Sequence, residues 1–127
     1  MSKSIIREKS LAFALDVIEV YKKLIEEREF VLSKQLLRFG TSIGANIEEA
    51  IAAQSRRDFL SKMSIASKEA RETRYWLILL QTSKLTKINL GEIIEKVDEL
   101  VRILTSIVKT TSETSFPIQI SKLKIQN

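Results

Sequence analysis

Small and apolar residues recur every three or four positions along one long segment of this 127-residue chain. The segment carries Phe59, Met63, Ala66, Ala70, Thr73, Leu77 and Leu80. Alternating steps of four and three residues place these side chains on one face of an α-helix. A half-buried strand would instead need an apolar residue at every second position. The spacing therefore predicts a helix over about residues 56–83 that buries one stripe against other helices.

Three further segments have the same spacing and predict helices over about residues 4–27, 33–53 and 90–111. The second helix has its inner stripe at Leu36, Gly40, Ile43, Ile47 and Ala50. The fourth has its stripe at Ile93, Val97, Leu100, Leu104, Ile107 and Thr111. The first has two adjacent stripes, Leu11, Ala14, Ile18, Tyr21 and Ile25 beside Phe13, Val17, Val20 and Leu24. Such a wide apolar face suits a helix with more than one neighbour.

Short connections between long helices favour antiparallel neighbours. Ser55 and Asn89 are expected to cap the third and fourth helices. The sequence therefore predicts an all-α, up-down-up-down antiparallel four-helix bundle in one domain, residues 1–111. Pro117 is expected to stop any helix in the remaining residues, 112–127. This C-terminal tail is either flexible or packed on a neighbouring surface.

Two glycines lie inside the second predicted helix, at Gly40 and Gly44. Glycine within a helix costs about 1 kcal/mol relative to alanine, so these positions need a structural reason. Close approach of another helix backbone is the simplest reason. An antiparallel hairpin places Gly40 level with Glu69 and Gly44 level with Ile65, so the third helix is the expected partner.

A polar line runs along the second helix at helical spacing, formed by Arg38, Ser42, Asn46 and Glu49. One interpretation is a binding strip for a phosphate or a base. The other, which we prefer, is a structural polar network in which Arg38 bridges to Glu69 or Glu72.

The chain contains no cysteine and no histidine. These absences remove thiol chemistry, the commonest general base and the commonest transition-metal ligand. An all-carboxylate metal site of Glu48, Glu49, Glu69 and Glu72 is conceivable, but salt bridges to arginine are the expected use of these groups. We therefore expect no catalytic residues, no metal and no cofactor. No apolar run approaches the roughly 20 residues that span a bilayer, so we expect a cytoplasmic protein without membrane contact.

The segment from Tyr75 to Leu80 is apolar on every side of its helix. A helix that is apolar all round is buried all round, by the tail or by another subunit. We expect self-association through Tyr75, Trp76, Ile78 and Leu79. The alternative is a single tryptophan on the surface of a monomer.

Two stretches, residues 30–50 and 68–77, resemble the signatures of 23S rRNA-intervening sequence proteins. The first includes Gly40-Thr41-Ser42-Ile43-Gly44-Ala45-Asn46-Ile47-Glu48-Glu49-Ala50, and the second includes Arg71-Glu72-Thr73-Arg74-Tyr75-Trp76. The likeness covers about residues 4–111, and Phe39 replaces an expected small residue. The resemblance implies a four-helix bundle assembled as a ring-shaped homopentamer. A related accessory protein of diversity-generating retroelements is a basic pentamer that binds nucleic acid and a reverse transcriptase.

The formal net charge is +5, and residues 55–84 hold seven basic and three acidic side chains. Candidate contacts to RNA or DNA are Arg56, Arg57, Lys62, Lys68, Arg71 and Arg74, with Lys22, Lys23 and Lys34 as further basic positions. A ring would multiply this excess of charge. A solvated helical face explains the same charges, and an adaptor that contacts only another protein is the competing function.

Overall fold

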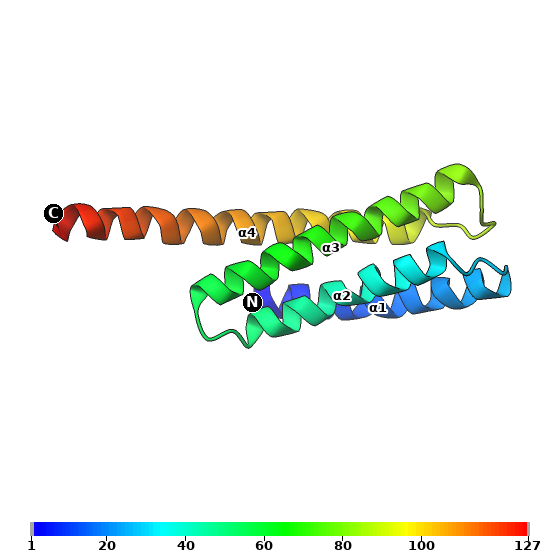
Figure 1. Ribbon diagram of the computed structural model, residues 1–127, viewed down its shortest axis with the longest axis horizontal. Coiled ribbons are helices and arrows are strands. Elements are labelled where there is room, and N and C mark those ends of the chain that lie inside the picture. Colours follow the sequence, from blue (N-terminus) through cyan, green and yellow to red (C-terminus); the bar gives the residue numbers. More distant parts are fainter. Residues whose placement is uncertain (1, 127) are drawn as a thin grey trace.

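The computed structural model describes the backbone of residues 2–126 and the side chains of residues 5–113. Within this part the protein is all-α, with helices α1 (Ser2–Glu26), α2 (Leu32–Ile51), α3 (Arg56–Ser83) and α4 (Gly91–Gln126). α1 and α2 form one antiparallel pair and α3 and α4 another, and α4 extends far beyond the end of the bundle (Figure 1). Each helix contacts two others, so that α1 lies diagonally across from α3 and α2 from α4. This arrangement is the predicted four-helix bundle.

The first three helices begin and end within two residues of the expected positions because local signals define their ends. Ser55 accepts a hydrogen bond from the backbone N–H of Asp58 at 3.0 Å and caps α3 as predicted. Asn89 accepts from the N–H of Gly91 at 3.0 Å at the start of α4. The cap of α2 was not predicted: the carboxylate of Glu29 accepts from the backbone N–H groups of the first two helical residues.

The prediction that the fourth helix ends near residue 111, with Pro117 as a stop, was wrong. The backbone of α4 is helical as far as Gln126. Proline has the φ angle of a helix, and it removes one N–H donor at a cost of about 3 kcal/mol, which disfavours a helix without forbidding it. The expected packing of the tail on a neighbouring surface lies outside the described side chains.

The core is formed by the inner stripes of all four helices. In α2, α3 and α4 these are largely the predicted stripes, although Phe59, Ile107 and Thr111 are only half-buried. In α1 the buried stripe is Ile6, Phe13, Val17, Val20 and Leu24. The other predicted stripe of α1 lies at the edge of the core, and Leu11 is 64% exposed. The first helix therefore has one buried face and one partly exposed apolar flank.

The close approach expected at the α2 glycines occurs against α1, so the predicted partner, α3, was wrong. A Cβ atom at Gly40 would lie 2.7 Å and 2.9 Å from the two γ-carbons of Val17. A Cβ atom at Gly44 would meet Ser10 at 3.5 Å or more, which is ordinary van der Waals contact. Only Gly40 is therefore required by packing.

A carboxylate joins the end of α1 to the connection between α3 and α4. Glu27 accepts hydrogen bonds from the hydroxyl of Thr86 at 2.5 Å and from the backbone N–H of Lys87 at 3.1 Å. These two bonds, the Thr86 bond first, lower the pKa of Glu27 below its ordinary value. The group therefore adds stability above its unfolded-state pKa, and this stability is lost as the pH falls through the lowered pKa.

Glu27→Gln is expected to lower the melting temperature slightly at neutral pH, because the neutral amide is a weaker acceptor for both donors. Below the lowered pKa of Glu27, wild type and variant should melt at nearly the same temperature. Thermal unfolding followed by circular dichroism from pH 3 to pH 7 provides the measurement. Glu26→Gln, at an exposed neighbouring position, is the control and should show no such pH-dependent difference. If the melting temperature of Glu27→Gln lies below that of wild type by the same amount at every pH, the charge of Glu27 does not cause the difference.

Candidate functional site

Two of the six basic side chains predicted to contact nucleic acid are paired with carboxylates. The Nζ of Lys62 lies 3.0 Å from Oε1 of Glu49 on α2. The Nε of Arg74 lies 2.5 Å from Oδ1 of Asp98 on α4. Exposed pairs of this kind contribute little stability, but each carboxylate cancels the charge that its partner would present to a polyanion. Lys62 and Arg74 are therefore poor candidates for phosphate contact.

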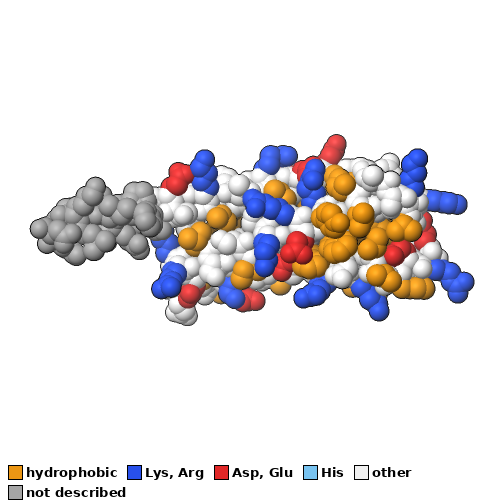
Figure 2. Space-filling view, turned by 45° about the horizontal axis from the view of Figure 1, so that its top comes forward, with side chains coloured by type: hydrophobic (Ala, Val, Ile, Leu, Met, Phe, Trp, Pro, Cys, Tyr) orange, Lys and Arg blue, Asp and Glu red, His pale blue; other side chains and the backbone are white. Residues whose placement is uncertain are grey.

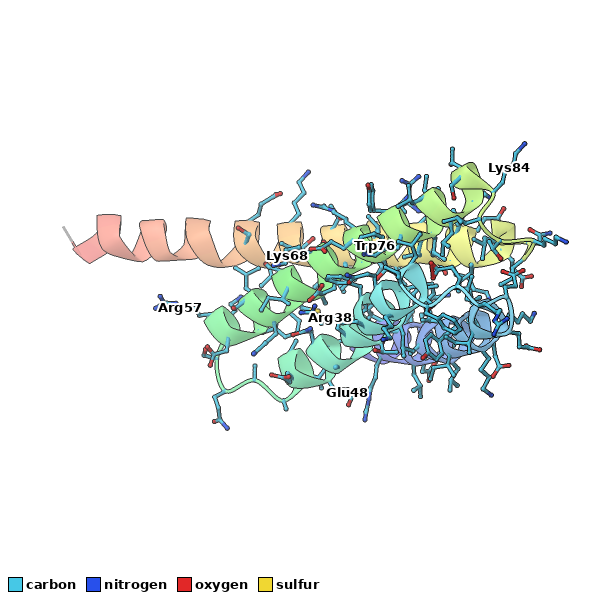
Figure 3. All side chains as sticks on the ribbon, turned by 45° about the vertical axis from the view of Figure 1, so that its right-hand side comes forward. Arg38, Glu48, Arg57, Lys68, Trp76 and Lys84 are labelled. Carbon is cyan, nitrogen blue, oxygen red and sulfur yellow. The ribbon has the colours of Figure 1, made fainter. Side chains whose placement is uncertain are left out.

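The other four basic side chains carry their charge without a carboxylate partner among the described residues. Arg56 and Arg57 are exposed at the first turn of α3, and Figure 3 shows Arg57 extending from the end of the bundle. Lys68 is exposed near the middle of α3, at the side of the helix that faces α4 (Figure 3). Arg71 lies one turn further on and donates a hydrogen bond from Nη2 to the hydroxyl of Thr105 at 3.1 Å. Lys68 and Arg71 thus both lie where α3 meets α4.

A groove of about 410 Å³ runs between α3 and α4 at this point; we call it the α3/α4 groove. It is lined by Ser64, Ser67, Lys68, Arg71, Thr105, Val108, Lys109 and Ser112. Among the described residues, this lining holds three cations, four hydroxyl groups and no carboxylate. Sequence analysis missed the α4 half of this groove. The sequence does place one polar stripe on α4, because helical spacing brings together Thr105, Lys109 and Ser112. Without the register between α3 and α4, however, this stripe could not be matched to Lys68 and Arg71.

The polar line on α2 does not form one connected network in the described part of the chain. The hydroxyl of Ser42 donates to the carbonyl oxygen of Phe39, and the Nδ2 of Asn46 donates to the carbonyl oxygen of Ser42, each at 2.9 Å. Glu49 pairs with α3 through Lys62. Two of the four groups therefore hydrogen-bond within their own helix, as serine and asparagine often do.

The bridge predicted between Arg38 and Glu69 or Glu72 is absent from the described ion pairs. The guanidinium of Arg38 is instead exposed over the ring of Phe39, 5.3 Å from its centroid. One carboxylate oxygen of Glu69 is enclosed by the protein without a hydrogen-bond partner among the described residues. The prediction failed because the side chain of Arg38 is exposed on the outer side of α2, whereas Glu69 is half-buried.

The residues predicted to form a subunit interface differ in exposure. Tyr75 is 59% exposed and packs edge-on against Trp76, with ring centroids 5.2 Å apart. Trp76 and Leu79 are half-buried, and Ile78 packs against the core. Figure 2 shows apolar side chains gathered over the half of the molecule that holds the C-terminal half of α3. We call Tyr75, Trp76 and Leu79 the α3 apolar face.

A second group of exposed apolar side chains lies on α1. Ile5, Leu11 and Leu15 are 48%, 64% and 56% exposed, and helical spacing places them on one side of the helix. We call these three residues the α1 apolar face. Beside them a groove of about 580 Å³ runs between α1 and α2, with Gly44 and Ala45 in its lining. Sequence analysis assigned Leu11 to an inner stripe and did not single out the other two.

A larger cavity at the end of the bundle is lined mainly by uncharged side chains among the described residues. This cavity has a volume of about 620 Å³ and lies among the end of α2, the start of α3 and the middle of α4. Among the described residues that line it, Arg56 alone is charged, and the remainder are apolar, hydroxyl or amide side chains. Within residues 5–113, no three acidic side chains lie close enough together to hold a metal ion. No described helix is long and apolar enough to cross a membrane.

Known proteins resemble this chain in both sequence and fold. A crystal structure of a protein of unknown function from the S23 ribosomal protein family of Bacteroides thetaiotaomicron matches with a TM-score of 0.80. The two sequences are 50% identical over 86% of this chain and 99% of that chain. No curated protein matches the sequence. The model of the 23S rRNA-intervening sequence protein family matches residues 2–106, and the chain therefore belongs to this family.

Proposed function

We propose that this protein is a non-enzymatic scaffold that assembles with copies of itself into a closed ring and binds nucleic acid through the basic surface of α3. The observation that carries the proposal is the presence of two unlike apolar faces on one protomer. The α1 apolar face and the α3 apolar face lie on helices that do not contact each other. Exposed apolar patches of this kind are typical of sites of protein association.

Two unlike faces on diagonally opposite helices favour contacts in which one face of a protomer packs on the other face of the next. Such heterologous contacts close into a ring when the rotation between neighbours allows it. A two-fold dimer would instead need one self-complementary patch. The likeness to pentameric members of the family favours five copies.

Nucleic acid is the proposed ligand because basic side chains without carboxylate partners gather on α3. In the described part of the chain, four basic side chains of α3 have no carboxylate partner: Arg56, Arg57, Lys68 and Arg71. A net charge of +5 per chain is modest, but a ring repeats it in each copy. Neutralised phosphates release their counterions, so such binding should weaken steeply as the salt concentration rises.

A protein adaptor without nucleic-acid contact is the second candidate function. Phe30 and Val31, in the connection before α2, are 50% and 71% exposed and belong to neither apolar face. A partner protein that docks on such apolar side chains would bind with little dependence on salt, because burial of apolar surface is not screened by ions.

Native mass spectrometry and light scattering, with and without a short single-stranded RNA or DNA over a salt series, test both parts of the proposal. A ring-sized mass that increases with nucleic acid at low salt and returns to the free mass at high salt would support it. A monomeric mass at micromolar concentration would refute the self-association. An oligomer that ignores nucleic acid at every salt concentration would favour the adaptor.

A further inference from the structure

The α3/α4 groove is distinguished from the rest of the basic surface by its chemistry. Every polar group in its lining is either a cation or a hydroxyl, so each can donate a hydrogen bond to an anionic oxygen. Lys68 and Lys109 are exposed, one on each wall, so their ammonium groups can reach a ligand in the groove. One turn further along both helices, the hydrogen bond to Thr105 holds the guanidinium of Arg71 across the contact between α3 and α4.

The two walls of the groove have matching periodicity. Ser64, Lys68 and Arg71 occupy one stripe of α3 over seven residues, and Thr105, Lys109 and Ser112 occupy the facing stripe of α4 over seven residues. Seven residues of helix rise by about 10 Å. This length exceeds the separation of neighbouring phosphates along a strand, so the groove can contact more than one of them. Donors therefore line the groove over the length of a short run of backbone.

We propose that the α3/α4 groove seats consecutive phosphate groups of a nucleic-acid strand, held by Lys68, Arg71 and Lys109. This inference rests on the proposed function and specifies where the nucleic acid binds. No aromatic side chain is among the described residues that line the groove, so these residues offer bases no surface on which to stack. Contacts to phosphates alone carry no sequence information. Binding should therefore be independent of base sequence.

The assignment divides the basic residues of α3 into two groups and adds one residue from α4. Lys62 and Arg74 are excluded as primary contacts because Glu49 and Asp98 neutralise them. Lys109 is added because the fold brings it opposite Lys68. The groove lies toward the N-terminal end of α3, whereas the α3 apolar face begins at Tyr75, so phosphate and a neighbouring subunit would use different parts of the helix.

The test compares two triple variants with the same change of net charge. Lys68→Gln/Arg71→Gln/Lys109→Gln removes the cations of the groove. Arg28→Gln/Lys84→Gln/Lys87→Gln removes three exposed cations from the opposite end of the bundle, where Figure 3 places Lys84. Affinity for fluorescently labelled single-stranded RNA and DNA of mixed sequence is measured from about 50 to 200 mM salt, the range over which phosphate contacts weaken strongly.

The groove variant should lose at least tenfold in affinity at the lowest salt, and the slope of log affinity against log salt should fall by about 2 to 3 per bound protomer. The control variant should lose less than threefold. Lys68→Arg/Lys109→Arg should bind as wild type does, because it keeps both charges. Thermal melts check that each variant is folded, and native mass spectrometry checks that its native mass is unchanged.

The failures are distinguishable. If wild type binds nucleic acid and both triple variants weaken it equally, the groove is not the site, whereas the proposed function stands. If wild type binds no RNA or DNA at any salt concentration, the proposed nucleic-acid function and the groove inference fall together. A preference of more than tenfold between homopolymers of different bases would also overturn a site that contacts phosphates alone.

Discussion

Gly40→Val is expected to lower the free energy of unfolding by about 3 kcal/mol, the upper part of the usual range for overpacking a core. Even the first added carbon would lie 2.7 Å from a γ-carbon of Val17 and 3.2 Å from its Cβ. Rotation of the valine side chain cannot relieve the second contact, because the Cβ atom is fixed to the backbone of α1. The α1 and α2 backbones must therefore move apart, and buried contacts are lost on both sides of the crossing.

Gly44→Ala is the matched control for this variant. Its added carbon would meet Ser10 at 3.5 Å, an ordinary contact distance. Alanine is the better helix former by about 1 kcal/mol, so this variant should be as stable as wild type or more stable by about 0.5 to 1 kcal/mol. The two glycines, one turn apart in the same helix, should thus respond in opposite directions.

Denaturant unfolding at matched protein concentration measures both effects, since self-association would make stability depend on concentration. Val17→Ala combined with Gly40→Val should cost at least 1 kcal/mol less than the sum of the two single changes, because the smaller side chain makes room for the larger one. If Gly40→Val unfolds at the wild-type midpoint, the close packing of α2 on α1 at this position is wrong.

Charged substitutions on either apolar face should each break the proposed ring into monomers. Leu11→Glu/Leu15→Glu places two carboxylates on the α1 apolar face, and Tyr75→Glu places one on the α3 apolar face. All three positions are more than half exposed, so the fold should tolerate the changes. Burial of an unpaired carboxylate in a subunit contact costs several kcal/mol, which is enough to dissociate an assembly at micromolar concentration.

A mixture of the two variants should form a one-to-one dimer. Each variant keeps one intact face, and the intact α3 face of the first variant can pack on the intact α1 face of the second. The remaining two faces of that dimer are both damaged, so the assembly cannot grow. Native mass spectrometry of the separate and mixed variants gives the answer. Isologous contacts, in which each face meets its own copy, would instead leave each variant dimeric by itself, and that result would exclude the proposed head-to-tail contact.

The sequence alone determined the number of helices, most of their ends and most of the core. Helical spacing and caps such as Ser55 act within a few residues of the chain, so they can be recognised without knowing how the helices pack. The exception was the end of α4. Pro117 destabilises a helix locally, which predicts that the helix stops there, but the helix continues to Gln126.

Packing between helices decided which apolar and basic side chains stay available on the surface, and the proposed function depends on these. α1 has two apolar stripes of similar character, and only the positions of α2 and α4 determine that Phe13 is buried and Leu11 is exposed. The sequence showed that Gly40 needed a close neighbour but did not identify the neighbour as Val17. Likewise, Lys62, Lys68 and Arg74 are indistinguishable as charges along one helix. Glu49 of α2 pairs with Lys62 and Asp98 of α4 pairs with Arg74, whereas Lys68 lines the α3/α4 groove. These differences depend on distance in space rather than on separation along the chain, so only the fold reveals them.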